Sequence, residues 1–395
     1  MTRPIHRSER SRRWLLITLL FVFWVLQAVQ AQSRWQLEVV DNGDGKKVGK
    51  FTSMAIDKDN NLHIGYYDET RHALRYAFRP ASSSQWFTME VDASGGFESL
   101  AVDTEDNPHF AYAGPDESGL RYAAWDGKTK KWNKQTIDAE HINFFNFIRI
   151  APNGLPRISY YHRLQKDGSY ALHLKYAHFD GSTWYTETVD PRSSTGKFNS
   201  LALDSQGMPH IAYSDVDIGD LRYASWDGSE WHFSAPDTHQ SADGWVGIGA
   251  SLELDKSGQP HIAYVDVGHK RIKYASWTAK SGWQAEAVDA LNGRVDNIDR
   301  VSLKIDSKNR PHIAYWDSGL GVLRYATLAA NGWKTETVDA GNNVGLYPSL
   351  AIDSHDDIYI SYYDMANGKL LLGHKRAAAE EPAPPHGETA KAQHQ

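Results

Sequence analysis

One segment recurs seven times along the chain, and this repetition limits the possible folds more than any other feature. The segment "SLALDSQGMPHIAYSD" begins at Ser200, and close copies begin at Ser251 and Ser302. Further copies begin at positions 53, 99, 147 and 349, so the period is about 50 residues. A repeat of this length is typical of a β-propeller, in which each blade is a four-stranded sheet.

Each copy carries the signals of separate strands. In the copy at Ser200, "SLALD" fits an inner strand, "SQGMP" a turn, "HIAYSD" a second strand and "LRYASW" a third, which a tight turn at "DGSE" follows. The better-preserved fourth strands read "WYTETVD" (residues 184–190) and "WKTETVD" (residues 333–339). Period-2 alternation between regular turn signals predicts an all-β protein.

The last copy lacks its fourth strand, and an unpaired strand stands at the other end of the chain. "RWQLEVVD" (residues 34–41) is similar to "WYTETVD" but has no blade before it. We therefore predict that it pairs with residues 370–375 and closes the ring, which removes the exposed sheet edges. The predicted domain is an all-β, seven-bladed β-propeller of four-stranded blades over residues 32–376.

The two ends of the chain differ from the repeats. Residues 1–31 contain five Arg, an apolar run of 13 residues and "AVQA", the pattern of a signal peptide. The run is short for a membrane span, which needs about 20 residues, although an uncleaved anchor is the alternative. We expect export to the periplasm or the cell exterior, without stable membrane insertion after cleavage. Residues 377–395 are polar and Pro-rich, which favours a disordered tail.

Charge and cysteine content exclude several kinds of chemistry. Residues 1–31 carry a net charge of +4, so cleavage would change the net charge from −7 to −11. Such an acidic protein is a poor match for nucleic acid. The absence of cysteine excludes disulfides and cysteine-based zinc sites. We expect a monomer that needs no metal or other cofactor.

We expect the polar residues that recur in most copies to have a structural role rather than to form a functional site. His210, Tyr213 and Asp204 recur in most copies, and seven equivalent catalytic centres are implausible. We expect Asp204 to fix its turn by accepting backbone amides, and the His and Tyr to be satisfied inside the blade. A functional residue should instead break the repeat, because only one site is needed.

The turns between the third and fourth strands carry a family resemblance. "SWDGSEW" (225–231), "AHFDGSTW" (177–184) and "AAWDGKTKKW" (123–132) look like shortened Asp boxes. On these turns the repeats over residues 51–376 resemble the sialidase-like, or BNR-like, seven-bladed propellers of exported bacterial proteins. The resemblance implies a propeller whose boxes are structural and lie away from the active face. Sialidases, ulvan lyases and lectins share such folds, so it implies no activity.

The inner strands show two breaks in the repeat. The third residue of the inner strand is Ala in four copies but Arg149, Glu253 and Lys304 in copies 3, 5 and 6. Either Glu253 and Lys304 form a structural ion pair while Arg149 is solvated, or these charges bind a ligand in the central channel, where charges focus potential. The residue two before the repeat's Ser is aromatic in five copies, which predicts packing between blades, but is Gly249 and Arg300 in copies 5 and 6.

Blade 3 breaks the end of the second strand. Five copies end "Y-x-D", whereas blade 3 ends "YYHR", which contains Tyr161, His162 and Arg163. Proton transfer by Tyr or His, with Arg neutralising a uronate carboxylate, is the chemistry of a polysaccharide lyase. The alternative is a variable loop. Tyr161, Trp245 and Trp316 are candidates for stacking on a sugar.

These breaks predict one patch at the channel mouth between blades 3, 5 and 6 that recognises a glycan or sugar acid. The predicted ligand-binding residues are Arg149, Arg163, Trp245, Glu253, Arg300, Lys304 and Trp316, and Tyr161 and His162 are the candidate catalytic residues. Two other interpretations stay open: a glycoside hydrolase or polysaccharide lyase acting at the same face, and a scaffold for protein partners.

Overall fold

The protein is described by a computed structural model, which covers residues 35–115, 118–166, 169–192, 194–239, 244–293, 295 and 300–377. The predicted signal peptide and all but the first residue of the predicted tail lie outside the described residues. Trp35–His374 forms one compact unit. Within the described part of the chain, no helix has the length and apolarity needed to cross a membrane.

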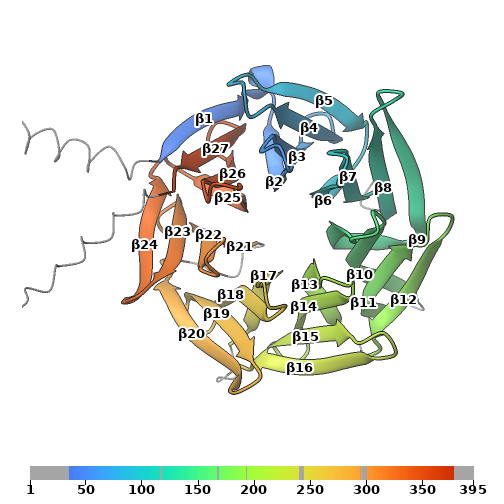
Figure 1. Ribbon diagram of the computed structural model, residues 1–395, viewed down its shortest axis with the longest axis vertical. Coiled ribbons are helices and arrows are strands. Elements are labelled where there is room, and N and C mark those ends of the chain that lie inside the picture. The colour runs from blue at the N-terminus through green and yellow to red at the C-terminus, as the bar shows by residue number, and fades with distance from the viewer. Residues whose placement is uncertain are drawn as a thin grey trace, which may run out of the picture. The chain divides into compact units, whose positions relative to one another are not determined.

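The compact unit is a ring of seven antiparallel blades around a central channel, as predicted (Figure 1). The strands nearest the channel are β2 (Val48–Ile56), β6 (Gly96–Val102), the second half of β9 (Lys131–Ile150), β13 (Thr195–Leu203), β17 (Val246–Leu254), β21 (Ser302–Ile305) and β25 (Val344–Ile352). The second strands are β3 (Leu62–Asp68), β7 (Pro108–Ala113), β10 (Pro156–Lys166), β14 (Pro209–Asp215), β18 (Pro260–Asp266), β22 (Pro311–Asp317) and β26 (Ile358–Asp364).

The outer half of each blade completes the four-stranded pattern. The third strands are β4 (Ala73–Arg79), β8 (Ser118–Asp126), β11 (Ser169–Phe179), β15 (Asp220–Trp226), β19 (Arg271–Thr278), β23 (Val322–Ala329) and β27 (Lys369–Lys375). The outermost strands are β5 (Phe87–Asp92), the first half of β9, β12 (Trp184–Asp190), β16 (Trp231–Asp237), β20 (Gly282–Ala290), β24 (Gly332–Asp339) and β1 (Gln36–Asp41). A short 3-10 helix, η1 (Gly43–Gly45), follows β1.

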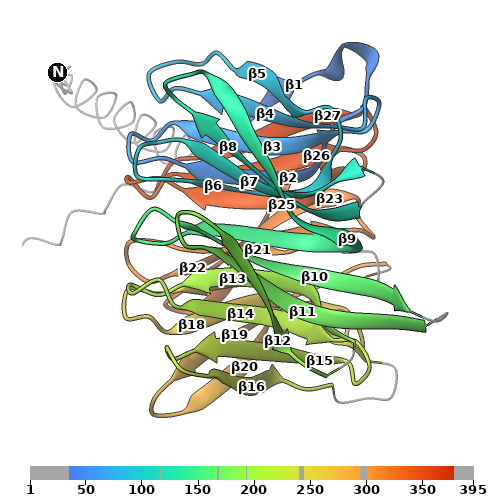
Figure 2. The same cartoon turned by 90° about the vertical axis from the view of Figure 1, so that its right-hand side faces the viewer.

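Blades 2 and 3 are joined more closely than the repeat predicts. The first half of β9 pairs with β8 and the second half with β10, so the two blades form one seven-stranded sheet. The β10–β11 hairpin of blade 3 also runs past the ends of its neighbours (Figure 2). Blade 3 therefore presents a longer second and third strand at one mouth of the channel.

The N-terminal strand closes the ring, as the unpaired sequence segment predicts. β1 pairs with β27 from Gln36↔His374 to Asp41↔Leu370 and becomes the outer strand of blade 7 (Figure 1). The indole of Trp35 packs edge-on against Tyr325 of blade 6 at 5.3 Å. Such an outer-strand Trp against the third-strand Tyr of the preceding blade recurs around the ring, for example between Trp333 and Tyr274 at 5.2 Å.

A hydrogen bond between tyrosine and aspartate links every pair of neighbouring blades. The Tyr of each second strand donates to the last Asp of the preceding blade's outer strand, as Tyr213 does to Asp190 at 2.7 Å. The seven pairs are Tyr66–Asp41, Tyr112–Asp92, Tyr160–Asp138, Tyr213–Asp190, Tyr264–Asp237, Tyr315–Asp289 and Tyr362–Asp339. The ring of hydrogen bonds is complete because β1 supplies Asp41.

The recurring His and Asp have partners inside their blades, in agreement with the structural interpretation. Asp204 accepts the amides of Gln206 and Met208 at 2.9 and 2.8 Å, and His210 bonds Tyr223 through Nδ1. The repeat's Ser is also structural, since its Oγ accepts an amide from the next inner strand. The bond from Met54 to Ser349, at 2.9 Å, spans the closure.

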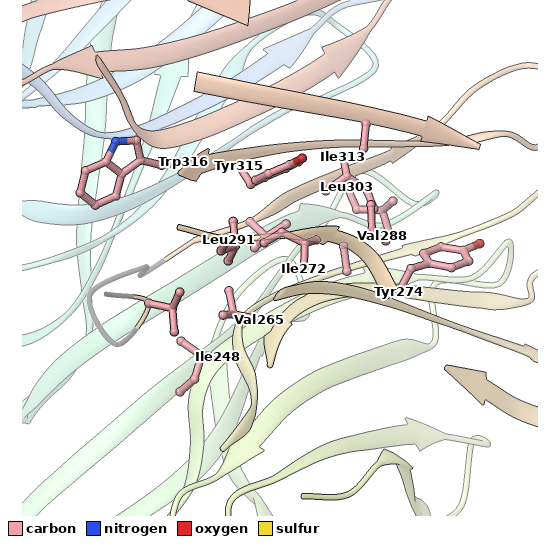
Figure 3. Packing of buried hydrophobic residues seen from close by; sticks show 14 of the residues in the cluster. Ile248, Val265, Ile272, Tyr274, Val288, Leu291, Leu303, Ile313, Tyr315 and Trp316 are labelled. Atoms are coloured by element: carbon pink, nitrogen blue, oxygen red, sulfur yellow. The ribbon is translucent and has the colours of Figure 1, made fainter. Parts of the chain in front are cut away.

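The hydrophobic core is divided among the joints between blades. One cluster joins blades 5 and 6 and includes Ile248, Val265, Leu303, Ile313 and Trp316 (Figure 3). Similar clusters fill the other joints. Because each blade buries its two faces against its neighbours, the ring gains its stability joint by joint.

Candidate ligand-binding site

A repeated β-bulge in the inner strands places side chains at one mouth of the channel. Six of the residues two positions before the repeat's Ser have a left-handed backbone: Phe51, Phe97, Phe145, Phe198, Gly249 and Tyr347, with φ between 52° and 62°. The strand register shifts at this point, for example between Lys50 and Ser53. Positive φ costs a bulky residue on the order of 1 kcal/mol, and bulges re-aim side chains.

Five aromatic rings at these positions form a collar around the channel. The collar consists of Phe51, Phe97, Phe145, Phe198 and Tyr347. Neighbouring ring centroids are 4.6 Å apart for Tyr347–Phe51, 4.4 Å for Phe51–Phe97, 6.3 Å for Phe97–Phe145 and 4.8 Å for Phe145–Phe198. These distances are those of favourable aromatic pairs. The aromatic residues therefore pack between blades, as predicted, and also edge the channel.

A cavity of about 570 Å³ opens at this mouth, a volume within the range of small-molecule sites. We call it the collar cavity. Its lining consists of Phe51, Phe97, Phe145, Tyr161, Arg163, Leu172, Ser194, Lys197, Val216, Asp217, Arg300 and Tyr347. Three of these side chains are cationic and one is a carboxylate. The cavity is thus aromatic and positively charged on a protein whose net charge is −7.

Arg300 takes the aromatic position in blade 6 and reaches across the channel. Its Nη1 donates to the carbonyl of Thr52 in blade 1 at 2.8 Å, and its guanidinium lies 5.3 Å from the ring centroid of Phe147 in blade 3. Gly249 in blade 5 leaves space for the backbone of Arg300, since a Cβ at position 249 would lie 3.1 Å from the backbone nitrogen of Arg300. The two breaks in the aromatic position are therefore linked.

The "YYHR" segment divides between two faces because side chains alternate along a strand. Tyr161 and Arg163 line the collar cavity. His162 points the other way, is 6% exposed and lies with its Nε2 3.9 Å from Oδ2 of Asp138. Burial raises the pKa of Tyr161 to about 12, although Arg163 opposes the shift. Tyr161 is consequently a neutral phenol at neutral pH.

Arg149, Glu253 and Lys304 lie at the opposite mouth. Arg149 and Lys304 line a second cavity of about 340 Å³ beside the turns between first and second strands. Glu253 forms ion pairs with Lys304 and, at 3.5 Å, with Arg149. Their position is four residues along the strand from the collar, which is about 13 Å. The structure therefore does not gather the predicted patch at one mouth. The Glu253–Lys304 pair is the structural alternative considered from the sequence, whereas Arg149 contacts Glu253 instead of being solvated alone.

Neither of the predicted stacking tryptophans lines the collar cavity. Trp316 is 7% exposed and packs in the core between blades 5 and 6 (Figure 3). Trp245 is 45% exposed and packs near Gly219, on the loop before β17. Residues 240–243, 294 and 296–299 of the loops that feed blades 5 and 6 lie outside the described residues.

Several lining residues were absent from the sequence prediction. Lys197 directly precedes a collar residue, and Ser194 and Asp217 lie on loops of blade 4 that meet at this mouth. The signal that could have located the site was the recurring aromatic position itself. A bulky residue that recurs where the strand must bulge is directed out of the pleat, toward the channel.

Comparisons with known proteins support the fold. No protein-family model and no curated protein matches the sequence. Among solved structures, the chain is similar to an ulvan lyase of polysaccharide lyase family PL25 (14% identity, 82% of this chain and 94% of that chain, TM-score 0.58). It is also similar to polysaccharide lyase Uly1 (10% identity, 82% and 89%, TM-score 0.55) and to the Aleuria aurantia lectin bound to α-methyl-L-fucoside (13% identity, 75% and 98%, TM-score 0.50). At these identities the likeness establishes a β-propeller, and the sialidase-like character of the turns stays a resemblance.

Proposed function

We propose that this protein is an exported carbohydrate-binding propeller that takes a sugar acid, such as a uronate or sialate, in the collar cavity. The observation that carries the proposal is the described lining of this cavity, which combines closely packed aromatic rings with Arg163, Lys197 and Arg300 and, among the described residues, one carboxylate, that of Asp217. Solved structures of similar fold include a fucoside-bound lectin and polysaccharide lyases, which favours the same class of ligand.

The lining offers the two kinds of contact that a sugar acid needs. The apolar face of a sugar ring packs on aromatic side chains such as Phe51, Phe97 and Tyr347. A planar guanidinium such as that of Arg163 binds a carboxylate through two parallel hydrogen bonds. Ser194 and Asp217 also line the cavity, and oxygen atoms of this kind can accept hydrogen bonds from sugar hydroxyls.

Binding without chemistry fits this geometry better than catalysis. A lyase needs a base close to the reacting proton, and a phenol whose pKa is raised to about 12, as for Tyr161, is a weak source of one at neutral pH. His162 lies on the other face of its strand, beside Asp138. The candidate acid–base pair is therefore not assembled around the cavity.

The test is a glycan array followed by titration calorimetry with D-glucuronate and, as a neutral match, D-glucose. We expect binding of the acid, weaker binding of glucose, and a tenfold to hundredfold loss of glucuronate affinity in Arg163→Gln. Arg149→Gln, at the opposite mouth, is the matched control and should bind like the wild type. Failure to bind any acidic glycan would refute the proposal, and release of an unsaturated uronate from a polysaccharide would replace it with a lyase.

Export is a separate part of the proposal. The Arg-rich, apolar segment of residues 1–31 is its basis. Mass spectrometry of the protein recovered outside the cytoplasm should find a chain that begins near Gln32. A chain that retains residues 1–31 would instead indicate a membrane anchor.

A further inference from the structure

The residue that follows each collar position forms a second layer of contacts between blades. In blades 1, 3 and 4 this residue is Thr52, Asn146 or Asn199, and all three are fully buried. Each donates a hydrogen bond to the carbonyl of the collar residue in the preceding blade: Thr52 to Tyr347 at 2.9 Å, Asn146 to Phe97 at 3.0 Å and Asn199 to Phe145 at 2.7 Å. Three blades therefore use a hydrogen-bond donor at this place, whereas blades 5, 6 and 7 have Ala250, Val301 and Pro348.

Blade 2 has Glu98 at the same place. Glu98 is also fully buried, and neither carboxylate oxygen has a hydrogen-bond partner among the described residues. An ionised carboxylate accepts hydrogen bonds but donates none. It cannot make the donation that Thr52, Asn146 and Asn199 make, whereas a protonated carboxyl can donate to the equivalent carbonyl, that of Phe51.

Within the described part of the chain, no other residue supplies Glu98 with a donor at the joint between blades 1 and 2. Its own backbone amide interacts with the carboxylate and, like Arg300, favours the ionised form. Thr52 and Asn199 each meet a serine of the preceding blade's second strand, Ser361 at 2.8 Å and Ser159 at 2.6 Å. The residue in the same register of blade 1 is Gly65, where the ring of Phe110 fills the space beside the backbone. Asn146, in the next blade, leaves its buried Oδ1 without a partner among the residues that the structure describes. A proton on Glu98 would add a donor where acceptors are in excess.

Arg300 connects Glu98 to the collar cavity. It lines that cavity, and its guanidinium contacts blades 1 and 3, on either side of the blade that carries Glu98. Of the charged groups in the described residues, Arg300 is the one whose field acts on Glu98. A metal ion at Glu98 would be repelled by this guanidinium, whereas a proton neutralises the carboxyl without adding charge.

Other charged side chains on the strands packed against β6 have partners elsewhere. These pairs are Lys50–Glu69, His63–Asp57, Asp68–Arg71, Arg75–Asp41, Arg79–Glu38, His109–Asp103, Lys134–Asp92, Asp138–Lys175 and Arg149–Glu253. The described lining of the collar cavity contains neither His nor Glu. Among the described residues, Glu98 is therefore the group whose titration would be felt in this cavity near neutral pH.

We propose that Glu98 carries a proton when the collar cavity binds an anion, and that its ionisation cancels the charge of Arg300 and weakens anion binding. The proposal rests on the proposed function of the cavity and adds its regulation by pH. Glu98 acts here as a positioning residue, since it acts through Arg300 and does not touch the ligand. Burial raises the pKa of Glu98 to about 8, with Arg300 opposing the shift, which places the transition in an accessible range.

The test compares the full-length mature protein with Glu98→Gln, which keeps a donor but cannot ionise, and with Glu90→Gln, an exposed control on β5. Titration calorimetry with D-glucuronate, and separately with sulfate, is carried out from about pH 6 to about pH 9.5, the range in which a carboxyl shifted by burial titrates. Wild type and Glu90→Gln should lose at least about tenfold in affinity over this range, as expected when a charged contact is neutralised. Glu98→Gln should keep its affinity.

A second measurement is independent of any ligand. The infrared carbonyl band of a protonated carboxylic acid should appear in the difference between wild type and Glu98→Gln at the acidic end and disappear at the alkaline end. Absence of this band at about pH 6, or the same pH dependence in wild type and Glu98→Gln, would overturn the proposal. If neither glucuronate nor sulfate binds at any pH, the proposed function and its regulation fall together, whereas binding that is insensitive to pH removes the regulation alone.

Discussion

The two mouths of the channel are built from the same inner strands, yet they differ in how their charges are balanced. In the described lining of the collar cavity, Arg163, Lys197 and Arg300 accompany one carboxylate, and aromatic rings cover the wall. At the other mouth, Glu253 is paired with both Lys304 and Arg149, and the rest of the described cavity wall is aliphatic. Among the described residues, cationic side chains outnumber carboxylates at both mouths, but aromatic rings lie beside them only in the collar cavity. The difference teaches that a break in the repeat indicates a candidate anion site where cations and aromatic rings line one cavity, rather than wherever a charge replaces alanine.

The collar mouth also carries a backbone feature that the other mouth lacks in the described residues. Its aromatic residues sit at a left-handed bulge, which re-aims them toward the channel. At the opposite mouth, Arg149, Glu253 and Lys304 occupy regular strand positions paired with the second strand, as Lys304 is with His312. Strain at the collar is offset by contacts between the aromatic rings, for example between Phe51 and Phe97, whose centroids are 4.4 Å apart.

The largest expected effect comes from opening the ring, because both mouths of the channel depend on its closure. Deletion of residues 32–41 removes β1, the indole of Trp35 and the Asp41 partner of Tyr66. Since closure holds blade 7 to blades 6 and 1, we expect loss of cooperative unfolding, measured by circular dichroism and calorimetry. Leu37→Ala, on the exposed side of β1, is the control and should change the free energy of unfolding by less than about 0.5 kcal/mol. A deletion variant that melts like the mature protein would show that the ring does not depend on β1.

The next largest effect is a dependence of stability on pH that originates at Glu98, next to the collar mouth. Burial raises the folded-state pKa of Glu98 from 4.5 to about 8, so the folded protein keeps a proton that the unfolded chain loses. Glu98 therefore favours the folded state fully below about pH 4.5, and stability falls as the pH rises toward 8. A pKa difference of one between the folded and unfolded states corresponds to about 1.4 kcal/mol. The free energy of unfolding of Glu98→Gln should therefore be several kcal/mol higher than that of the wild type at about pH 8.5, and the two should be equal near pH 5. Urea denaturation at both pH values measures this, and the same dependence of stability on pH in the two proteins would contradict it.

A smaller effect tests the contrast between the mouths directly. Arg163→Gln should weaken glucuronate binding by about 1.5–3 kcal/mol, as expected for a hydrogen bond to a charged group. Its partner at the other mouth, Arg149→Gln, should leave the affinity unchanged because Arg149 is engaged with Glu253. Calorimetry with glucuronate on the two variants shows which mouth binds the ligand. A loss of affinity in Arg149→Gln alone would place the binding site at the opposite mouth.

The smallest effect concerns the paired mouth. Lys304→Ala removes one partner of Glu253 and leaves the contact with Arg149. Because these side chains are 20–30% exposed, the free energy of unfolding should fall by no more than about 1 kcal/mol and less at high salt. Thermal melts at low and high salt measure this. A clear loss of glucuronate binding in Lys304→Ala would show that this mouth takes part in recognition.

The sequence alone could have shown that some of the predicted site residues lie too far apart to form one patch. The collar position and the third residue of the inner strand are four residues apart, so Arg300 and Lys304 must lie about 13 Å apart along one strand. Likewise, alternation in a strand puts Tyr161 and Arg163 on one face and His162 on the other. The predicted single patch combined residues that this spacing keeps apart.

The sequence by itself determined the ring. A repeat of about 50 residues, seven copies and one unpaired strand at residues 34–41 leave a closed seven-bladed propeller as the arrangement that pairs every edge. These features depend on local pattern and counting, which the order of residues contains in full.

Only the tertiary structure decided what meets inside the channel. Glu98, Phe147 and Arg300 belong to three different blades and are separated by up to 202 positions in the chain. Arg300 contacts blades 1 and 3 because its long side chain crosses the axis. Among the described residues Glu98 has no side-chain donor at its joint, since Gly65 stands where blades 3 and 7 carry Ser159 and Ser361. Periodicity places each residue on its strand, but the path of a side chain across the channel depends on the packing of all blades at once.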